Sequence, residues 1–232
     1  NKLLSNSTYF YIITVGITII YSILFYFMIK KIKIKKDILK YVVILLYTIS
    51  FIGAIYAIIT LINKVVWADE ICSLAMIRNN FKEIFSINAQ DVHPPFYYIM
   101  LKLFVDFLTF INSGFDVIIL GKVFSFIPYV LALVLINTKI RKNHGILTSS
   151  ILTFFITFMP QLMVNFVELR MYSWGMLLVL VSYVYLFDAI LINTKKSWIL
   201  FTIFSTLAVY VHFYSCLSMV FMYAFLLCYA II

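Results

Sequence analysis

The feature that most limits what this chain can fold into is a series of long apolar stretches separated by short clusters of charged residues. Each stretch has about twenty residues, the length at which a helix crosses roughly 30 Å of bilayer hydrocarbon. The apolar fraction is 65% and the mean hydropathy is +1.07, whereas a soluble domain is only about half apolar. We therefore predict an all-α integral membrane protein.

The apolar stretches predict seven membrane spans. The last run, Trp198–Ile232, is too long for one span, and we divide it near Phe213 because His212 and Ser215 interrupt it. The first run is expected to be a retained helix with the N-terminus outside, because its lysines follow it, unlike those of a signal peptide. The five other predicted spans are Thr8–Ile29, Tyr41–Ile62, Val117–Thr138, Ile146–Val164 and Met171–Ile192.

The segment Pro95–Phe110 is predicted to lie at the membrane interface without crossing it. It is short for a span, and Lys102 and Asp106 form an i,i+4 pair on one helix face. A charge at the bilayer centre costs at least about 2.5 kcal/mol. If this segment does not cross, three basic clusters share the cytoplasmic side. They are Lys30, Lys31, Lys33, Lys35, Lys36 and Lys40; Lys139, Arg141 and Lys142; and Lys195 and Lys196.

The same topology accounts for the net charge of +9 and places most acidic residues outside the cytoplasm. We therefore expect membrane lipids as partners and no nucleic acid. The outer acidic residues are Asp69, Glu70, Glu83, Asp91, Asp106, Asp116 and Glu168. Because acidic residues contribute little to orientation, their gathering on one face suggests a use there. The three cysteines lack metal-ligand spacing, and we expect neither a metal nor another cofactor.

Two candidate motifs lie in the long outer loop. In WADEICS, Asp69 follows a span directly and is either a general base or the N-cap of the next helix, with Glu70 beside it. In DVHPPFYY, two prolines stiffen the start of a helix. The motif is either a rigid turn with a solvated His93, or it places Asp91, His93 and Tyr97 at the rim of a cavity near Asp69.

Two more candidate motifs lie nearer the C-terminus. In NFVELRMYSWG, Glu168 and Arg170 either form an interfacial ion pair, or Arg170 is a phosphate ligand, because a guanidinium matches a phosphate with a planar fork. In YVHFYS, His212 belongs either to an aromatic belt or to the same outer cavity.

Together these motifs resemble the GT-C glycosyltransferase superfamily, in particular the bacterial relatives of dolichyl-phosphate-mannose protein mannosyltransferases. The resemblance covers roughly residues 41–232. It rests on W-x-D-E-x-x-S, D-x-H-P-P-F-Y-Y, E-x-R-x-Y and Y-x-H-F-Y, which begin at Trp67, Asp91, Glu168 and Tyr210.

The resemblance implies a GT-C-like helix bundle with juxtamembrane helices in the outer loop 63–116. It also implies a polyprenyl-phosphate sugar donor and transfer with inversion on the extracytoplasmic side of the plasma membrane. Asp69 maps onto the presumed base and Arg170 onto the arginine near the donor phosphate. We expect Glu70 at the catalytic position as well, and a substrate-binding set of Asp91, His93, Tyr97, Glu168, Arg170, Tyr172 and His212.

The expected organisation is an extra transmembrane helix with a basic cytoplasmic loop (1–40), followed by the catalytic module (41–232). Because proteins of this family are typically longer, we expect the module to be truncated at its C-terminus. The leading expectation is a hexosyl- or pentosyltransferase acting on a lipid, glycan or protein acceptor of the cell envelope. A transporter or flippase of lipid-linked sugars, relying on Asp188 and Asn165, and a non-catalytic membrane subunit are the alternatives.

Overall fold

The computed structural model describes residues 16, 19, 23, 26, 37–91 and 93–231, and within these ranges it contains helices and turns but no strand. The all-α expectation is therefore confirmed for this part of the chain, and the expected first span, Thr8–Ile29, lies almost entirely outside it. The helices are α2 (Asp37–Asn63), α3 (Ala68–Met76), α4 (Phe81–Asn88), α5 (Phe96–Ile111), α6 (Val117–Leu135), the π-helix η1 (Ile136–Ile140), α7 (Arg141–Phe158), α8 (Pro160–Val167), α9 (Tyr172–Ile192), α10 (Lys195–Val211) and α11 (Ser215–Ile231).

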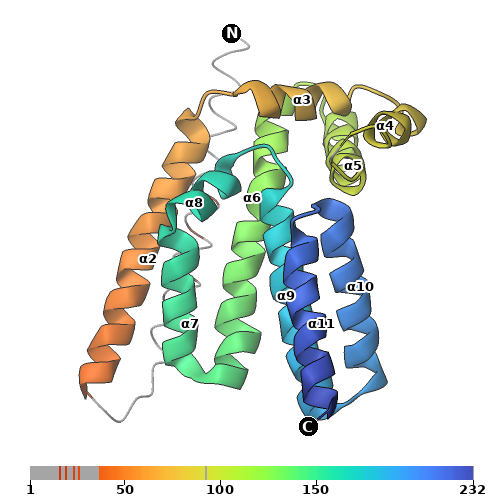
Figure 1. The fold of residues 1–232 in the computed structure, drawn as a ribbon. Coiled ribbons are helices and arrows are strands. Elements are labelled where there is room, and N and C mark those ends of the chain that lie inside the picture. The colour runs from red at the N-terminus through yellow and green to blue at the C-terminus, as the bar shows by residue number, and fades with distance from the viewer. Residues whose placement is uncertain are drawn as a thin grey trace.

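Three helical stretches of the described chain are long and apolar enough to cross a membrane: Ile38–Leu61, Val117–Phe158 and Tyr172–Ile192. The second has 42 residues and is not straight. At Gly145 the backbone has φ +86°, a value that glycine adopts without steric cost. The chain reverses in this region, so that α6 and α7 lie antiparallel (Figure 1). A further apolar helix, Ser215–Ile231, is shorter.

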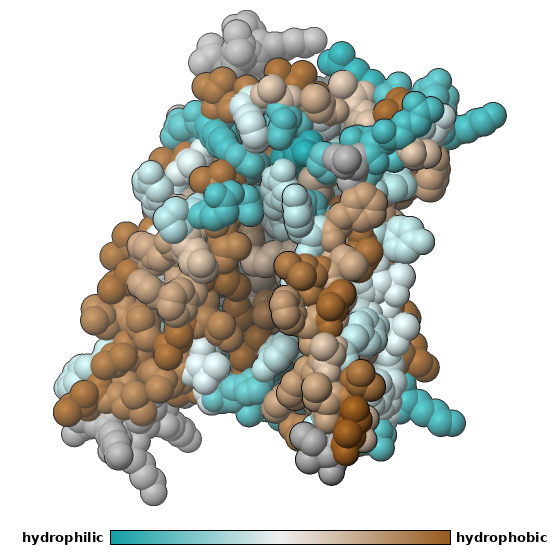
Figure 2. Space-filling view, viewed as in Figure 1, coloured by the Kyte–Doolittle hydropathy of each residue, from teal (hydrophilic) through white to brown (hydrophobic). Residues whose placement is uncertain are grey.

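The bundle has two chemically different ends. Helices α3, α4 and α5 gather at one end, together with the connections 168–171 and 212–214; we call this the motif end (Figure 1). The reversal between α6 and α7 and the α9–α10 turn lie at the other, basic end, which carries Lys139, Arg141, Lys142, Lys195 and Lys196. Figure 2 shows a broad apolar belt between these two polar ends, as expected of a protein immersed in lipid.

Several predicted boundaries agree with the structure, and one is wrong. Helices α2 and α9 occupy two of the predicted spans, and the last apolar run is broken at residues 212–214. The run Ile146–Val164, however, is not one helix: α7 ends at Phe158 and Met159 is extended, with ψ 117°. The reason is Pro160, whose ring disfavours helical geometry at the preceding residue and suits the first turn of α8.

Helix α5 has the properties expected of an interfacial helix. It is 16 residues long and is not among the candidate spans of the described chain. The Nζ atom of Lys102 lies 3.0 Å from the Asp106 carboxylate, which confirms the predicted i,i+4 pair. The exposed side chains Leu103, Phe107 and Phe110 form an apolar surface along this helix.

A buried polar network holds α2 against η1 and α7 inside the apolar belt. The Tyr47 hydroxyl donates to Asn137 Oδ1 at 2.8 Å and lies 3.1 Å from Ser149 Oγ. The Asn137 amide donates to Thr153 Oγ1 at 3.1 Å. Polar groups buried in this way must be satisfied by one another, and such bonds join helices within membranes.

The two-ended architecture predicts which exposed positions share a side of the membrane. In a background with Cys72, Cys216 and Cys228 replaced by serine, we would introduce cysteines at Gln90 and Ser113 of the motif end and at Lys142 and Lys196 of the basic end. All four positions are exposed. In sealed vesicles an impermeant maleimide should label the first two from one side and the last two from the other. Labelling of Gln90→Cys and Ser113→Cys from opposite sides would show that α5 crosses the bilayer.

Candidate functional site

The four sequence motifs meet at the motif end around the guanidinium of Arg170. Its Nη1 donates to the carbonyl oxygen of Asp69 at 3.2 Å and to Ser73 Oγ at 3.4 Å. Its Nη2 lies 3.2 Å from Nε2 of His93 and 3.9 Å from the Asp69 carboxylate. Arg170 therefore links helix α3, His93 and the connection between α8 and α9.

The Arg170 side chain is buried but keeps its charge, and one of its donors has no partner. Burial disfavours the charged form, yet the neighbouring Tyr98 and Tyr172 phenols and the Asp69 carboxylate outweigh burial, and the pKa of Arg170 is raised. The guanidinium also lies 5.8 Å from the centre of the Tyr172 ring, within reach of a cation–π attraction. Its Nε–H has no hydrogen-bond partner among the described residues, and a buried donor without a partner is costly.

Glu70 is fully buried and joins two distant segments of the chain. One carboxylate oxygen accepts the Leu169 N–H at 2.8 Å, and the other accepts the Trp67 N–H at 3.1 Å. Glu70 therefore fixes the connection 168–171 against the start of α3, and both its oxygens are occupied by backbone donors. This carboxylate positions Arg170 and is not open to a substrate.

Asp69, next to Glu70, is the accessible carboxylate of the pair. Its side chain is 43% exposed. The N-cap of α3 is Trp67, so the alternative in which Asp69 caps this helix is wrong. The reason is that Asp69 already has helical geometry in the first turn, whereas the cap must precede the helix. Asp69 thus presents its carboxylate to solvent at the edge of the Arg170 cluster.

Gly121 of α6 allows the connection 168–171 to approach closely. A Cβ atom at this position would lie 2.4 Å from Cδ1 of Leu169. Leu169 is completely buried, so its side chain has little room to move away. The absence of a side chain at Gly121 therefore lets Leu169 occupy the place from which its N–H reaches Glu70.

Glu168 does not pair with Arg170, contrary to one sequence interpretation. Its carboxylate binds Lys64 Nζ at 2.6 Å, and the ammonium of Lys122 donates to the backbone carbonyl of Lys64. The sequence analysis missed both lysines. The sequence did contain a signal for Lys122, because a charged residue close to the start of an otherwise apolar run often has a functional role. In the structure its side chain is buried.

The two histidines of the motifs lie close to Arg170 and Tyr172, His93 beside Arg170 and His212 beside Tyr172. His93 Nδ1 is 3.4 Å from the Asp91 carboxylate, so His93 stands between Asp91 and Arg170. The His212 ring meets the Tyr172 ring edge-on at 5.1 Å. Burial lowers the pKa of His212, and His93 and Arg170 lower it further, which favours a neutral imidazole at pH 7.

The two tyrosines of DVHPPFYY have different environments. Tyr97 is fully buried, and its hydroxyl lies 3.0 Å from Ser125 Oγ on α6. It therefore packs α5 against the bundle, because its ring is enclosed by apolar neighbours such as Phe124. Tyr98 lies nearer the site: burial raises its pKa to about 12, against the opposing influence of Arg170.

Two groups at the motif end could take part in chemistry. They are the accessible carboxylate of Asp69 and the buried guanidinium of Arg170, whose Nε–H has no partner. Among the described residues no group of three or more His, Cys, Asp or Glu side chains is arranged to hold a metal ion. Asp69 can accept a proton, and Arg170 can stabilise an anion, which together suit a reaction with an anionic leaving group.

Comparison with protein-family models, curated proteins and solved structures gives no match for this chain. The functional argument therefore rests on the residues and their geometry.

The structure predicts that substituting Glu70 destabilises the protein much more than substituting its neighbour Asp69. Glu70→Gln places an amide N–H₂ against one of two backbone N–H groups, and a buried polar group left unsatisfied costs about 1–3 kcal/mol. Asp69→Asn, at a largely exposed position, should change the free energy of unfolding by no more than about 0.5 kcal/mol. Denaturant unfolding of both variants in detergent measures this difference. Equal destabilisation would contradict the structural role assigned to Glu70.

Proposed function

We propose that this protein is an integral membrane glycosyltransferase that moves a sugar from a polyprenyl-phosphate donor to an acceptor of the cell envelope. The observation that carries the proposal is the buried Arg170, whose Nε–H lacks a partner, beside the accessible Asp69 carboxylate. A phosphate that displaced one of the groups now covering the guanidinium could satisfy this donor, and a guanidinium binds phosphate strongly. The resemblance of the four motifs to GT-C enzymes favours the same reaction.

The proposed bundle is GT-C-like, with seven spans and with the motif end outside the plasma membrane. The basic end would then face the cytoplasm, in agreement with the positive-inside rule. Helices α3, α4 and α5 would be the juxtamembrane helices of the outer loop. The donor's polyprenyl chain would remain in the lipid while its phosphate reached Arg170 at the membrane surface.

In the proposed mechanism, the acceptor oxygen forms a bond to the anomeric carbon as the bond from that carbon to the phosphate oxygen breaks. Asp69 takes the acceptor proton. The departing electron pair stays on the polyprenyl phosphate, where Arg170 stabilises the charge. Such a leaving group needs no proton, unlike the alkoxide released by glycoside hydrolases, so one carboxylate base is sufficient.

His93 and Tyr172 support this reaction by holding Arg170. His93 connects Arg170 to Asp91, and Tyr172 presents its ring to the guanidinium. Glu168 contributes indirectly, because its pair with Lys64 holds the connection 168–171. The contacts of these residues therefore orient the two groups that would meet the substrate.

The transporter alternative relies on two polar residues that lie at opposite ends of the bundle. Asp188 pairs with Lys139 at 3.1 Å at the basic end, while Asn165 of α8 accepts from Gln161 at 3.2 Å near the motif end. A transferase and a flippase also differ in a simple property. A transferase forms its product in detergent solution, where there are no two compartments, whereas a flippase forms none.

The function is tested with full-length protein in detergent. Radiolabelled polyprenyl-phosphate hexoses and pentoses serve as donors, and envelopes from cells lacking the gene supply acceptors. We expect labelled acceptor and free polyprenyl phosphate in equal amounts. Asp69→Asn should lower turnover about a hundred- to ten-thousand-fold, because it removes a general base. Glu83→Gln is the matched control: it alters an exposed carboxylate of the same end whose local role is to cap α4, and glutamine can form the same capping box.

The possible outcomes test the proposed function and the proposed role of Asp69 separately. Absence of transfer from every donor would refute the proposed function. Transfer by the wild type together with more than about a tenth of its turnover in Asp69→Asn would exceed the range for a lost base and would remove Asp69 from that role.

Arg170→Lys tests the donor-phosphate contact. Lysine keeps the positive charge but loses the planar fork, so the apparent KM for the lipid donor should rise about tenfold while the KM for the acceptor changes little. The estimate corresponds to the loss of one charge-assisted hydrogen bond. Thermal unfolding of the same variant separates this effect from loss of the contacts to Ser73 and His93. Unchanged donor kinetics in a folded Arg170→Ala protein would exclude the phosphate role.

A further inference from the structure

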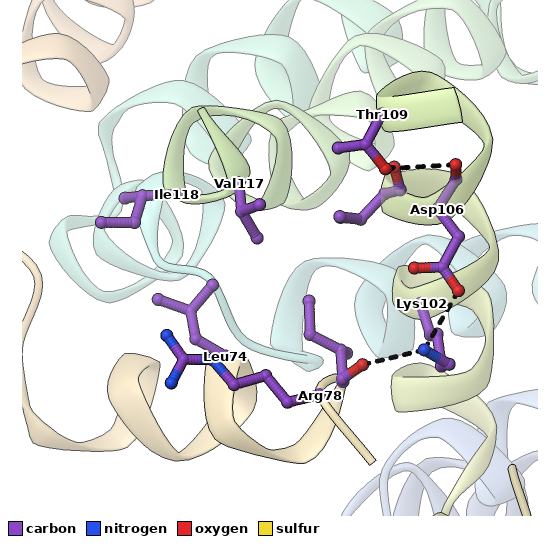
Figure 3. Close-up of a pocket in the computed structure, with 9 residues that line it drawn as sticks. Leu74, Arg78, Lys102, Asp106, Thr109, Val117 and Ile118 are labelled. Carbon is purple, nitrogen blue, oxygen red and sulfur yellow. Dashed lines mark hydrogen bonds and ion pairs between the residues drawn. The ribbon is translucent and has the colours of Figure 1, made fainter. Parts of the chain in front are cut away.

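A pocket opens at the motif end, and neither Arg170 nor Asp69 is among the residues that line it. It has a volume of about 420 Å³ and is enclosed by α3 and the residues that follow it, by α5 and by the start of α6 (Figure 3). Its walls are mainly apolar, formed by Leu74, Ile77, Val105, Val117 and Ile118. Its polar lining residues are Arg78, Lys102, Asp106 and Thr109.

The charges in this pocket leave one cation uncompensated. The Lys102 ammonium donates to the Ile77 carbonyl at 3.0 Å and pairs with Asp106 at 3.0 Å. The guanidinium of Arg78 is exposed and forms no side-chain hydrogen bond or ion pair within the described parts of the chain. Figure 3 shows the Arg78 side chain extended along the wall of α3, with its guanidinium beside Leu74. The pocket therefore suits an anionic group.

The position of the pocket identifies the surface that would supply this anion. Val117 and Ile118 are the first residues of a candidate membrane span, so the pocket lies at the depth of the lipid headgroups. A neighbouring face of α5 exposes Leu103, Phe107 and Phe110, as in a helix that lies on a bilayer. A lipid headgroup at this depth could therefore contact the unpaired guanidinium of Arg78 and the apolar wall of the pocket at the same time.

We propose that this pocket binds the phosphate of an anionic membrane phospholipid. Arg78 is the phosphate ligand, because its planar fork can bind two phosphate oxygens at once. The apolar side chains from α3, α5 and α6 receive the glycerol and the first part of an acyl chain. The volume falls within the range of about 300–1,000 Å³ that is usual for small-molecule sites. This proposal does not depend on the glycosyltransferase function.

The test uses full-length protein in detergent with equal amounts of phosphatidylglycerol and phosphatidylethanolamine, and native mass spectrometry counts the retained lipids. We expect the wild type to retain phosphatidylglycerol preferentially. Arg78→Gln should weaken this retention about tenfold, as for the loss of a charge-assisted hydrogen bond. Thr109→Trp, which fills the pocket and leaves Arg78 in place, should weaken it as well. Lys82→Gln is the matched control, because Lys82 is an exposed cation of α4 that does not line the pocket.

Three results would overturn the proposal. Equal loss of phosphatidylglycerol in Lys82→Gln and Arg78→Gln would indicate only the general positive charge of the protein. Equal retention of the two lipids by the wild type would remove the preference for an anion. Complete displacement of phosphatidylglycerol by millimolar inorganic phosphate would identify free phosphate as the ligand. The last two measurements use the wild type, so they remain decisive even if a variant fails to fold.

Discussion

The arrangement of the motif end depends on the buried carboxylate of Glu70. It accepts backbone N–H groups from Trp67 and Leu169, and so connects the start of α3 to a segment about a hundred residues later. A carboxylate without such partners would be very unfavourable in this apolar setting. With them, it holds the 168–171 connection in one place, and Arg170 can reach Asp69, Ser73 and His93 from there. The arrangement around Arg170 is thus supported by a carboxylate that is itself fully buried.

The sequence predicted the gathering of the motifs well, but not the partners within it. Apolar lengths and basic clusters were sufficient to place Asp69, His93, Arg170 and His212 at one end of a bundle. They could not show which of the adjacent carboxylates is buried, because neighbouring positions on a helix differ by about 100° in direction and that direction is set by packing. The same limitation separates the enclosed Tyr97 from Tyr98.

Long-range ion pairs were the least predictable part of the site. Lys64 and Glu168 are far apart in sequence, and the sequence favours the nearer Arg170 as the partner of Glu168, whereas the fold places Lys64 Nζ 2.6 Å from the Glu168 carboxylate. Helix breaks were easier to predict where the local chemistry is strong. His212 and Ser215 correctly marked the break between α10 and α11, whereas the effect of Pro160 on Met159 was overlooked within an apolar run.

The close contact between Gly121 and Leu169 makes position 121 sensitive to any substitution, although no polar group is involved in the contact. Any other amino acid at Gly121 adds a Cβ atom 2.4 Å from Leu169 Cδ1. In a saturation mutagenesis screen, a loss of function at this codon would therefore report on the spacing between α6 and the 168–171 connection. Under the proposed mechanism, the same loss at Asp69 or Arg170 would report on proton or anion chemistry. Gly121 thus separates geometry from reactivity in a way that substitutions of the charged residues cannot.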